Sequence, residues 1–159
     1  MRGVVLPVDY RRIEASLAEI LAEPWDAVVL LGVAIGRPMI TLERVAINYR
    51  DPGRPDNEGF APSETAVVEG GPDAYFTSLP IDRLKLALDD EGVPAAISLT
   101  AGPYLCNASM YLARHMLNER GTPAGFVHLP PSPDLACGAE PMAMEMQLRG
   151  MRRILRELA

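Results

Sequence analysis

The chain carries a thiol at a place where it could act as a nucleophile. Cys106 follows the Gly102-Pro103 turn, between a strand-like run and a helix-like run. In the first turn of a helix, unpaired N–H groups and the helix dipole stabilise an anion, so we expect the pKa of the Cys106 thiol to be lowered. The alternative is that Cys106 is a small buried core residue, which is a common place for a free cysteine.

Two other residues could complete a hydrolytic site around this thiol. His128 ends a strand-like apolar run, and in a parallel sheet it would emerge at the same edge as Cys106. Glu43 lies in an apolar segment, so its carboxylate needs a partner, which His128 Nδ1 would supply. His115 lies on roughly the opposite side of the helix from Cys106 and is a poor partner. Thiol, imidazole and carboxylate together predict a cysteine peptidase.

Each of these two residues also has a purely structural interpretation. His128 could simply cap a strand. Glu43 could form a buried salt bridge with an arginine instead of binding a histidine. The adjacent Arg44 is not the obvious partner, because neighbouring residues of a strand point to opposite faces. The sequence alone leaves these alternatives open.

Alternating strand and helix patterns must position these side chains. A long segment over residues 50–72 is dense in proline, glycine, aspartate and asparagine and predicts an irregular loop. Strands separated by helices need crossover connections, so we expect an α/β fold: a three-layer α/β/α sandwich with a largely parallel central sheet. The predicted strands cover 3–8, 26–31, 39–48, 95–99 and 124–129, and the predicted helices cover 11–22, 80–91, 105–119 and 142–158.

Composition and charge limit the classes of protein to which this chain can belong. A length of 159 residues with 48% hydrophobic residues suits one domain over residues 1–159. The net charge of −6, without a basic stripe, argues against nucleic acid. The sequence has no apolar run long enough for a membrane span and no signal-peptide order, which predicts a cytoplasmic protein. We expect Cys106 and Cys137 to be free thiols, and no metal or cofactor, because no zinc spacing, phosphate loop or dinucleotide motif is found.

Two long motifs resemble the pyroglutamyl peptidase I family, the pyrrolidone-carboxylate peptidases. The segment from Gly36-Arg37 through residues 40–48 is similar to the glutamate signature of that family, and residues 100–107 are similar to its cysteine signature. Shorter matches follow in the family's order, so that the resemblance covers nearly the whole chain. They lie at residues 55–59, 70–72, 74–75 and 125–128.

The resemblance implies an activity and a role for each site residue. It implies that Cys106 attacks the carbonyl after an N-terminal pyroglutamate, that His128 protonates the leaving amine, and that Glu43 orients His128. Water would then hydrolyse the acyl-enzyme. The substrate-binding residues implied by the family are Val8, Tyr104 and Leu105 in an apolar slot for the lactam ring, and Arg54 near the oxyanion.

Departures from the family pattern motivate further expectations. The family has an amino-terminal strand and loop before the segment that matches Val8, so we expect the sheet to lack that first strand and a homo-oligomer to cover the edge. The arginine that the family places near the oxyanion is shifted by one position in this sequence, where it is Arg54. In the glycine-containing loop 32–36, Val33 and Ile35 are bulkier than the residues of the family pattern. Two alternatives are therefore a non-catalytic descendant that serves as an oligomeric or binding scaffold, and a thiol amidase of another specificity.

Overall fold

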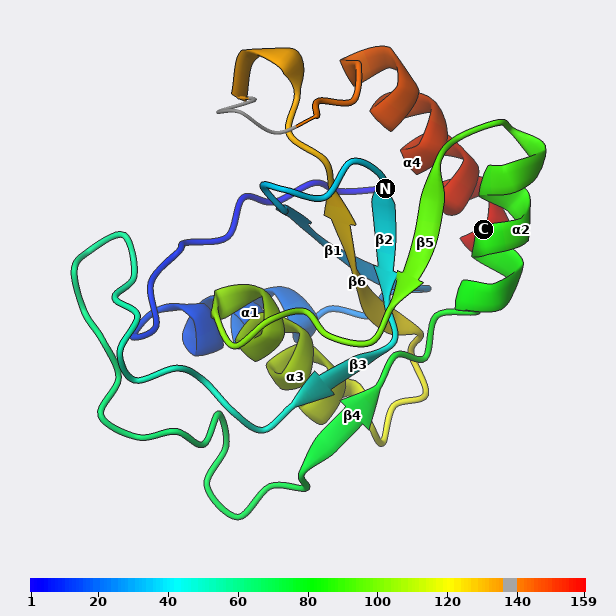
Figure 1. The fold of residues 1–159 in the computed structure, drawn as a ribbon. Helices are drawn as coiled ribbons and strands as arrows, with labels where there is room; N and C mark the ends of the chain where they lie inside the picture. Colours follow the sequence, from blue (N-terminus) through cyan, green and yellow to red (C-terminus); the bar gives the residue numbers. More distant parts are fainter. Residues whose placement is uncertain (136–139) are drawn as a thin grey trace.

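A mixed sheet forms the centre of the computed structural model, which describes residues 1–135 and 140–159 (Figure 1). In the described residues its strand order is β1-β6-β2-β5, with bounds Val28–Val33, Ala124–Leu129, Ile40–Glu43 and Ala95–Ser98 respectively. The pairs β1·β6 and β2·β5 are parallel, whereas β2 and β6 are antiparallel. The largely parallel sheet is confirmed, with one antiparallel junction at its middle.

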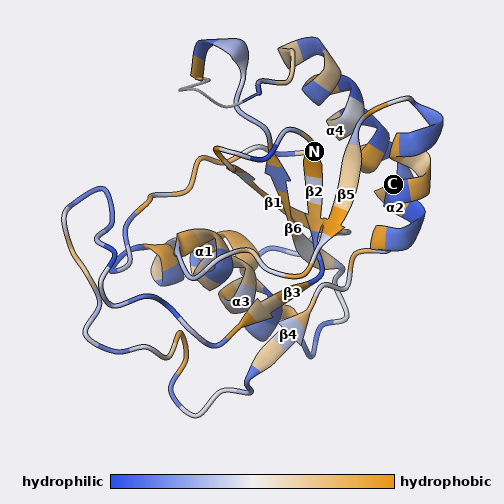
Figure 2. Ribbon diagram, viewed as in Figure 1, coloured by the Kyte–Doolittle hydropathy of each residue, from blue (hydrophilic) through white to orange (hydrophobic). Residues whose placement is uncertain are grey.

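Two pairs of helices cover the two faces of this sheet. Helices α1 (Ile13–Leu21) and α3 (Leu105–Leu117) pack on one face, where Leu30 and Phe126 of the sheet enter a shared core. The other face carries α2 (Ile81–Asp90) and α4 (Met144–Leu158), which pack with Leu42 and Val127. Figure 2 shows hydrophobic residues concentrated on the central strands, while the helices alternate hydrophobic and hydrophilic residues. The three-layer α/β/α architecture is confirmed.

Helix positions follow the predicted hydrophobic stripes. In α1 the buried residues are Ile13, Leu17 and Leu21, which are four apart and therefore lie on one side of the helix. Helix α2 begins after Pro80 and ends before Gly92, whose φ of +66° is accessible to glycine at little cost. No helix of the described residues is long and apolar enough to cross a membrane.

The predicted strand 39–48 divides into two strands that belong to different sheets. Between β2 and β3 (Val45–Ile47), the Arg44 backbone donates to Ser98 and accepts from Thr77. These two bonds direct the chain out of the central sheet, and β3 then pairs antiparallel with β4 (Ala74–Phe76). Strand β4 was not predicted, because three residues are too few to show an alternating pattern.

The predicted strand at residues 3–8 is wrong. This segment has no regular secondary structure and pairs with no described strand, and Val5 is 96% exposed. Leu6 packs against the α1/α3 core, and the carbonyl of Val8 accepts a hydrogen bond from Asn57 N (3.2 Å). An apolar alternation makes a strand only where a ladder partner is available. The long segment 50–72 is irregular, as predicted, and its residue Asn57 supplies the hydrogen bond to Val8 in place of a strand partner.

The antiparallel junction changes how the site is assembled. Strand β5 runs parallel to β2, and β2 runs antiparallel to β6. The carboxyl ends of β5 and β6 therefore point in opposite directions along the strand axes. The expectation that Cys106 and His128 emerge at one common edge is therefore wrong. The segment between β5 and α3 has to carry Cys106 over the face of the sheet instead, and Gly102 provides the turn with φ +78°.

Candidate active site

Glu43 and His128 form a buried hydrogen bond. His128 Nδ1 lies 2.7 Å from Glu43 Oε1, and the two residues are 4% and 0% exposed. In the β2·β6 register Glu43 pairs with Phe126 and Thr41 with His128, so that all four side chains share the face covered by α3. An ionised carboxylate can only accept, so Nδ1 is the donor of this bond, and in the neutral imidazole Nε2 then keeps a lone pair.

Arg37 forms a salt bridge with the carboxylate of Glu43 that also binds His128. Its Nη1 lies 2.5 Å from Glu43 Oε1, and the arginine side chain is 30% exposed while that of Glu43 is fully buried. The buried salt bridge that the sequence left open is thus present together with the histidine bond. Burial alone would raise the pKa of Glu43, but hydrogen bonds from His128, Ser98 and Arg37 lower it below its ordinary value. Glu43 is therefore a charged group in the interior.

Cys106 lies in the first turn of α3, directly over β1. A Cβ atom built on Gly32 would lie 3.2 Å from Cys106 Sγ and 2.9 Å from Phe126 Cζ. Asn107, the next residue, fixes this turn: its amide accepts from Ile47 N (2.9 Å) and donates to Ile47 O (2.8 Å) and to Tyr49 O (2.8 Å). The position of the thiol is thus set by the close approach of α3 to a glycine of β1.

The pKa of the Cys106 thiol is raised, contrary to the expectation from the helix terminus. Burial is the main cause, and the negative charge of Glu43 adds to it. The positive charges of Arg54 and Arg37 act in the opposite direction and do not overcome these effects. A thiol with a raised pKa needs a neighbouring base to become a nucleophile.

The structure brings the three predicted catalytic residues to one region of the sheet. Gly32, which contacts Cys106, is the register partner of His128 in the parallel pair β1·β6. The Phe126 ring packs 4.6 Å from the His128 ring and also borders Gly32. Sulfur and imidazole therefore lie on the same face of the sheet, and Glu43 is bonded to the imidazole on that face.

Three of the four predicted substrate-binding residues, Arg54, Tyr104 and Leu105, lie at the beginning of α3. Arg54 stacks on the Tyr104 ring, with its guanidinium carbon 4.3 Å from the ring centre, and the Tyr104 hydroxyl donates to Pro55 O (3.2 Å). Val8 is 41% exposed, whereas Leu105 is 5% exposed and packs in the α1/α3 core. The structure thus places Arg54 and Tyr104 beside each other, and it places the Leu105 side chain in the interior.

Sequence reasoning missed three residues around Glu43. Arg37 Nη1 donates to Thr41 Oγ1 (2.8 Å) as well as to Glu43, and it lies 3.4 Å from Ser98 Oγ. The only available signal was strand parity, which places Thr41 on the same face as Glu43. Arg37 and Ser98 come from other segments, and no local pattern brings them to β2.

Other polar groups lie away from this site. His115 bonds the Tyr75 hydroxyl through Nδ1 (2.8 Å), which agrees with its dismissal as a partner of Cys106. No group of three or more metal-binding side chains occurs in the described residues. Cys137 falls outside the described residues.

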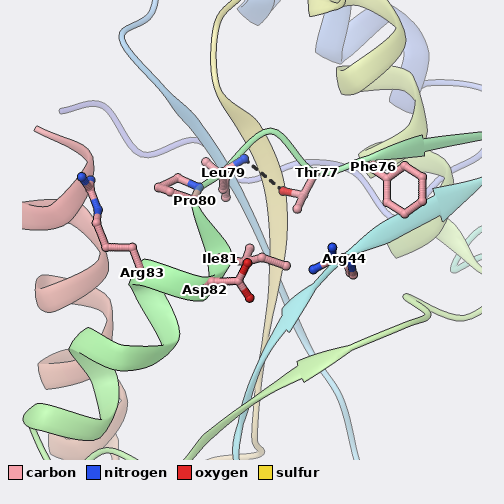
Figure 3. Close-up of a pocket in the computed structure, with 8 residues that line it drawn as sticks. All are labelled: Arg44, Phe76, Thr77, Leu79, Pro80, Ile81, Asp82 and Arg83. Carbon is pink, nitrogen blue, oxygen red and sulfur yellow. Dashed lines mark hydrogen bonds between the residues drawn. The ribbon is translucent and has the colours of Figure 1, made fainter.

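A pocket of about 340 Å³ opens at the junction of the two sheets and α2 (Figure 3). Its lining includes Arg44, Phe76 and Asp82, but no thiol, imidazole or buried carboxylate. Arg44 follows Glu43 in the chain, and the close-up shows its side chain among the residues that line this pocket. We do not assign the chemistry to this pocket, because it lacks a nucleophile.

Comparisons with known proteins show the family of this chain. The family described as pyroglutamyl peptidase matches residues 1–157. A pyrrolidone-carboxylate peptidase of Thermococcus onnurineus is 48% identical over 128 residues, which are 79% of this chain and 64% of that protein. One of Clavibacter michiganensis is 46% identical over 143 residues, which are 89% of this chain and 67% of that protein. This chain thus spans about two thirds of the length of these relatives.

A solved structure shows the same fold. The crystal structure of pyrrolidone carboxyl peptidase from Thermus thermophilus superposes with a TM-score of 0.91 at 39% identity, covering 97% of this chain and 81% of that one. The two proteins therefore share one fold over nearly all of this chain.

Proposed function

The chain belongs to the pyroglutamyl peptidase family, and from that premise we propose that it removes N-terminal pyroglutamate from peptides through a triad of Cys106, His128 and Glu43. The observation that carries this proposal is the buried bond between His128 and Glu43 (2.7 Å) on the sheet face that also holds Cys106. A histidine held by a carboxylate beside a thiol is the constellation that thiol acyl transfer requires.

Each step of the reaction follows from the chemistry of these three groups. His128 Nε2 takes the proton of the Cys106 thiol as the sulfur attacks the pyroglutamyl carbonyl. The C–N bond to the next residue then breaks, His128 gives the proton to the leaving amine, and the pyroglutamyl group remains on sulfur as a thioester. Water, deprotonated by His128, attacks the thioester and releases pyroglutamate and the free thiol. Glu43 stays ionised and stabilises the imidazolium formed in both halves.

Arg54 and Tyr104 are the proposed contacts of the substrate. The Arg54 guanidinium lies over the Tyr104 ring, at the start of the helix that bears Cys106. We assign Arg54 to the oxyanion that develops on the attacked carbonyl, where a positive charge favours the transition state. Val8, Tyr104 and Leu105 are assigned to the slot for the lactam ring. Because the Leu105 side chain is buried in the core, Leu105 is assigned to the slot through its backbone.

The setting of this activity is also a proposal. We propose that the protein acts in the cytoplasm on peptides that begin with pyroglutamate, because a nucleophilic cysteine must remain reduced. We further propose that it forms a homo-oligomer, since β1 is an edge strand of the described sheet with exposed apolar side chains.

Hydrolysis of a fluorogenic pyroglutamyl amide tests the proposal. The wild-type protein should release the fluorophore, iodoacetamide should abolish the release, and Cys106→Ser should reduce kcat/KM by at least about 10³-fold. A prolyl amide of the same fluorophore is the control substrate, because it lacks the lactam carbonyl. Faster turnover of another N-terminal group would indicate a thiol amidase of different specificity, and binding of a pyroglutamyl peptide without product would indicate a non-catalytic descendant.

A further inference from the structure

Arg37 connects three segments that meet at the proposed triad. It lies in the loop between β1 and β2, and its Nη1 donates to Glu43 Oε1 (2.5 Å) and to Thr41 Oγ1 (2.8 Å) on β2. Its Nη2 donates to the carbonyl of Thr100 (3.0 Å), in the segment between β5 and Cys106. One guanidinium therefore ties the carboxylate that orients the imidazole to the backbone that leads to the thiol.

The carboxylate of Glu43 depends on this guanidinium for its position. Its Oε1 accepts both from His128 Nδ1 and from Arg37 Nη1. Its Oε2 is buried and has no hydrogen-bond partner among the described residues. Without Arg37, the carboxylate is free to turn either oxygen toward the imidazole, and the buried charge loses the one arginine that pairs with it among the described residues.

Arg37 also acts on the electrostatics of the thiol. The charge of Glu43 faces that of Arg37 and the imidazole of His128, and it opposes ionisation of Cys106. The charged and titratable groups that act on Cys106 are Glu43, Arg54 and Arg37, with Tyr104 close by. Arg37 offsets the field of Glu43 at the sulfur, while it leaves that carboxylate ionised for its bond to His128.

From these contacts we propose that Arg37 is a positioning residue of the proposed triad: it holds Glu43 Oε1 on His128 and sets the distance between that pair and the segment that carries Cys106. The inference rests on the proposed function, since it gives a role to a residue that touches no substrate. Its effect on the thiol is nevertheless measurable without turnover.

The test compares Arg37→Gln with Arg44→Gln. Arg44 is the matched control, because it is an arginine next to Glu43 whose side chain lines the separate pocket of Figure 3. The first readout is the pH dependence of iodoacetamide alkylation at Cys106, located by peptide mapping so that Cys137 does not contribute. The second is kcat and KM for the pyroglutamyl amide, and thermal unfolding verifies that both variants are folded.

The expected results separate a positioning role from a merely structural one. Arg37→Gln should move the midpoint of Cys106 alkylation to higher pH by about one unit and reduce kcat by about 10²-fold with little change in KM, because misplacement of catalytic groups acts on the transition state. Arg44→Gln should match the wild type in both readouts. A folded Arg37→Gln protein with the wild-type midpoint and kcat would overturn the inference.

A second variant keeps the inference falsifiable if Arg37→Gln does not fold. Arg37→Lys keeps the charge but cannot bridge Glu43 and Thr100 with two nitrogens, so it should keep the alkylation midpoint and lose kcat by about tenfold. An unchanged kcat in Arg37→Lys would contradict the bridging role. If the wild type alkylates at Cys106 but turns over no pyroglutamyl amide, the proposed function fails, while a shifted midpoint in Arg37→Gln still supports the inference.

Discussion

Glu43 is a charged residue in a place that excludes water, and its partners explain why it is tolerated there. It is 0% exposed and carries hydrogen bonds from a histidine and an arginine. A buried ion pair that only stabilised the fold could be replaced as a whole by apolar side chains at little cost. A carboxylate that orients a catalytic imidazole cannot, because its charge has to stabilise the imidazolium during the reaction.

Replacement of Glu43 by glutamine should therefore affect catalysis more than stability. Glu43→Gln keeps the shape and an acceptor oxygen for His128 but removes the charge, so kcat should fall by about 10²- to 10⁴-fold. Glu119→Gln, at an exposed carboxylate, is the control and should retain wild-type kinetics. Steady-state kinetics on the pyroglutamyl amide measure the effect, and a folded Glu43→Gln protein with wild-type kcat would exclude Glu43 from the triad.

The raised pKa of Cys106 gives a second prediction at the scale of single residues. Because burial and Glu43 favour the neutral thiol, the thiolate fraction at neutral pH is smaller than for a free cysteine and grows as the pH rises. Alkylation of Cys106 in the folded protein should thus reach its half-maximal rate at higher pH than in the same protein unfolded in urea. A midpoint below that of the unfolded protein would mean that His128 and the helix terminus outweigh burial.

At the scale of elements, the site depends on how closely α3 approaches β1. Gly32 lies where any side chain would meet Phe126 Cζ at 2.9 Å and Cys106 Sγ at 3.2 Å. Phe126 is 3% exposed and belongs to the α1/α3 core, so it has little room to move. The absence of a side chain at residue 32 is what lets the thiol lie over the sheet.

Gly32→Ala should displace the thiol. We expect a loss of about 10-fold or more in kcat together with a loss of about 1–3 kcal/mol in the free energy of unfolding, the usual cost of an overpacked core. Gly3→Ala is the control, because nothing lies within 4 Å of a Cβ built there. Urea unfolding and steady-state kinetics measure the two effects, and Gly32→Ala with both values unchanged would show that α3 lies farther from β1.

Elements with a strong local pattern could be predicted from the sequence. The four helices and β6 occur close to their predicted bounds, because their apolar spacing and the flanking proline or glycine residues are local signals. The division at Arg44 and the antiparallel direction of β6 against β2 could not be predicted, since both depend on hydrogen bonds with segments distant in the sequence.

The candidate site shows the same division between local and distant signals. Glu43 and His128 could be found because a polar residue in an apolar run must have a partner. Arg37 could not, since its bonds to Glu43 and Thr100 arise only when β2 and β5 are paired. The pKa of Cys106 was predicted with the wrong sign, because the sequence shows a helix terminus but not how deeply the thiol is buried.

At the scale of the whole molecule, one edge of the sheet is unusually apolar. Strand β1 is at the end of the described strand order, and Leu31, Val33 and Ile35 on it and just after it are 49%, 49% and 67% exposed. Edge strands with apolar side chains favour pairing with another chain. We therefore predict a homo-oligomer in solution.

Light scattering coupled to size exclusion should detect that oligomer at micromolar protein. Leu31→Lys together with Val33→Lys should shift the distribution toward the monomer, because two charges on the edge oppose association. The exposed Leu86→Lys on α2 is the control and should leave the mass unchanged. A monodisperse wild-type monomer would contradict the prediction.

The proposed mechanism requires a covalent bond between the sulfur of Cys106 and the pyroglutamyl group, and acid-quenched turnover detects that bond directly. Wild-type protein mixed with a pyroglutamyl ester, quenched within the first turnover and digested, should yield the peptide containing Cys106 with one pyroglutamyl group attached through a thioester, which hydroxylamine removes. Turnover without an adduct at Cys106, or an adduct on a different residue, would contradict the account.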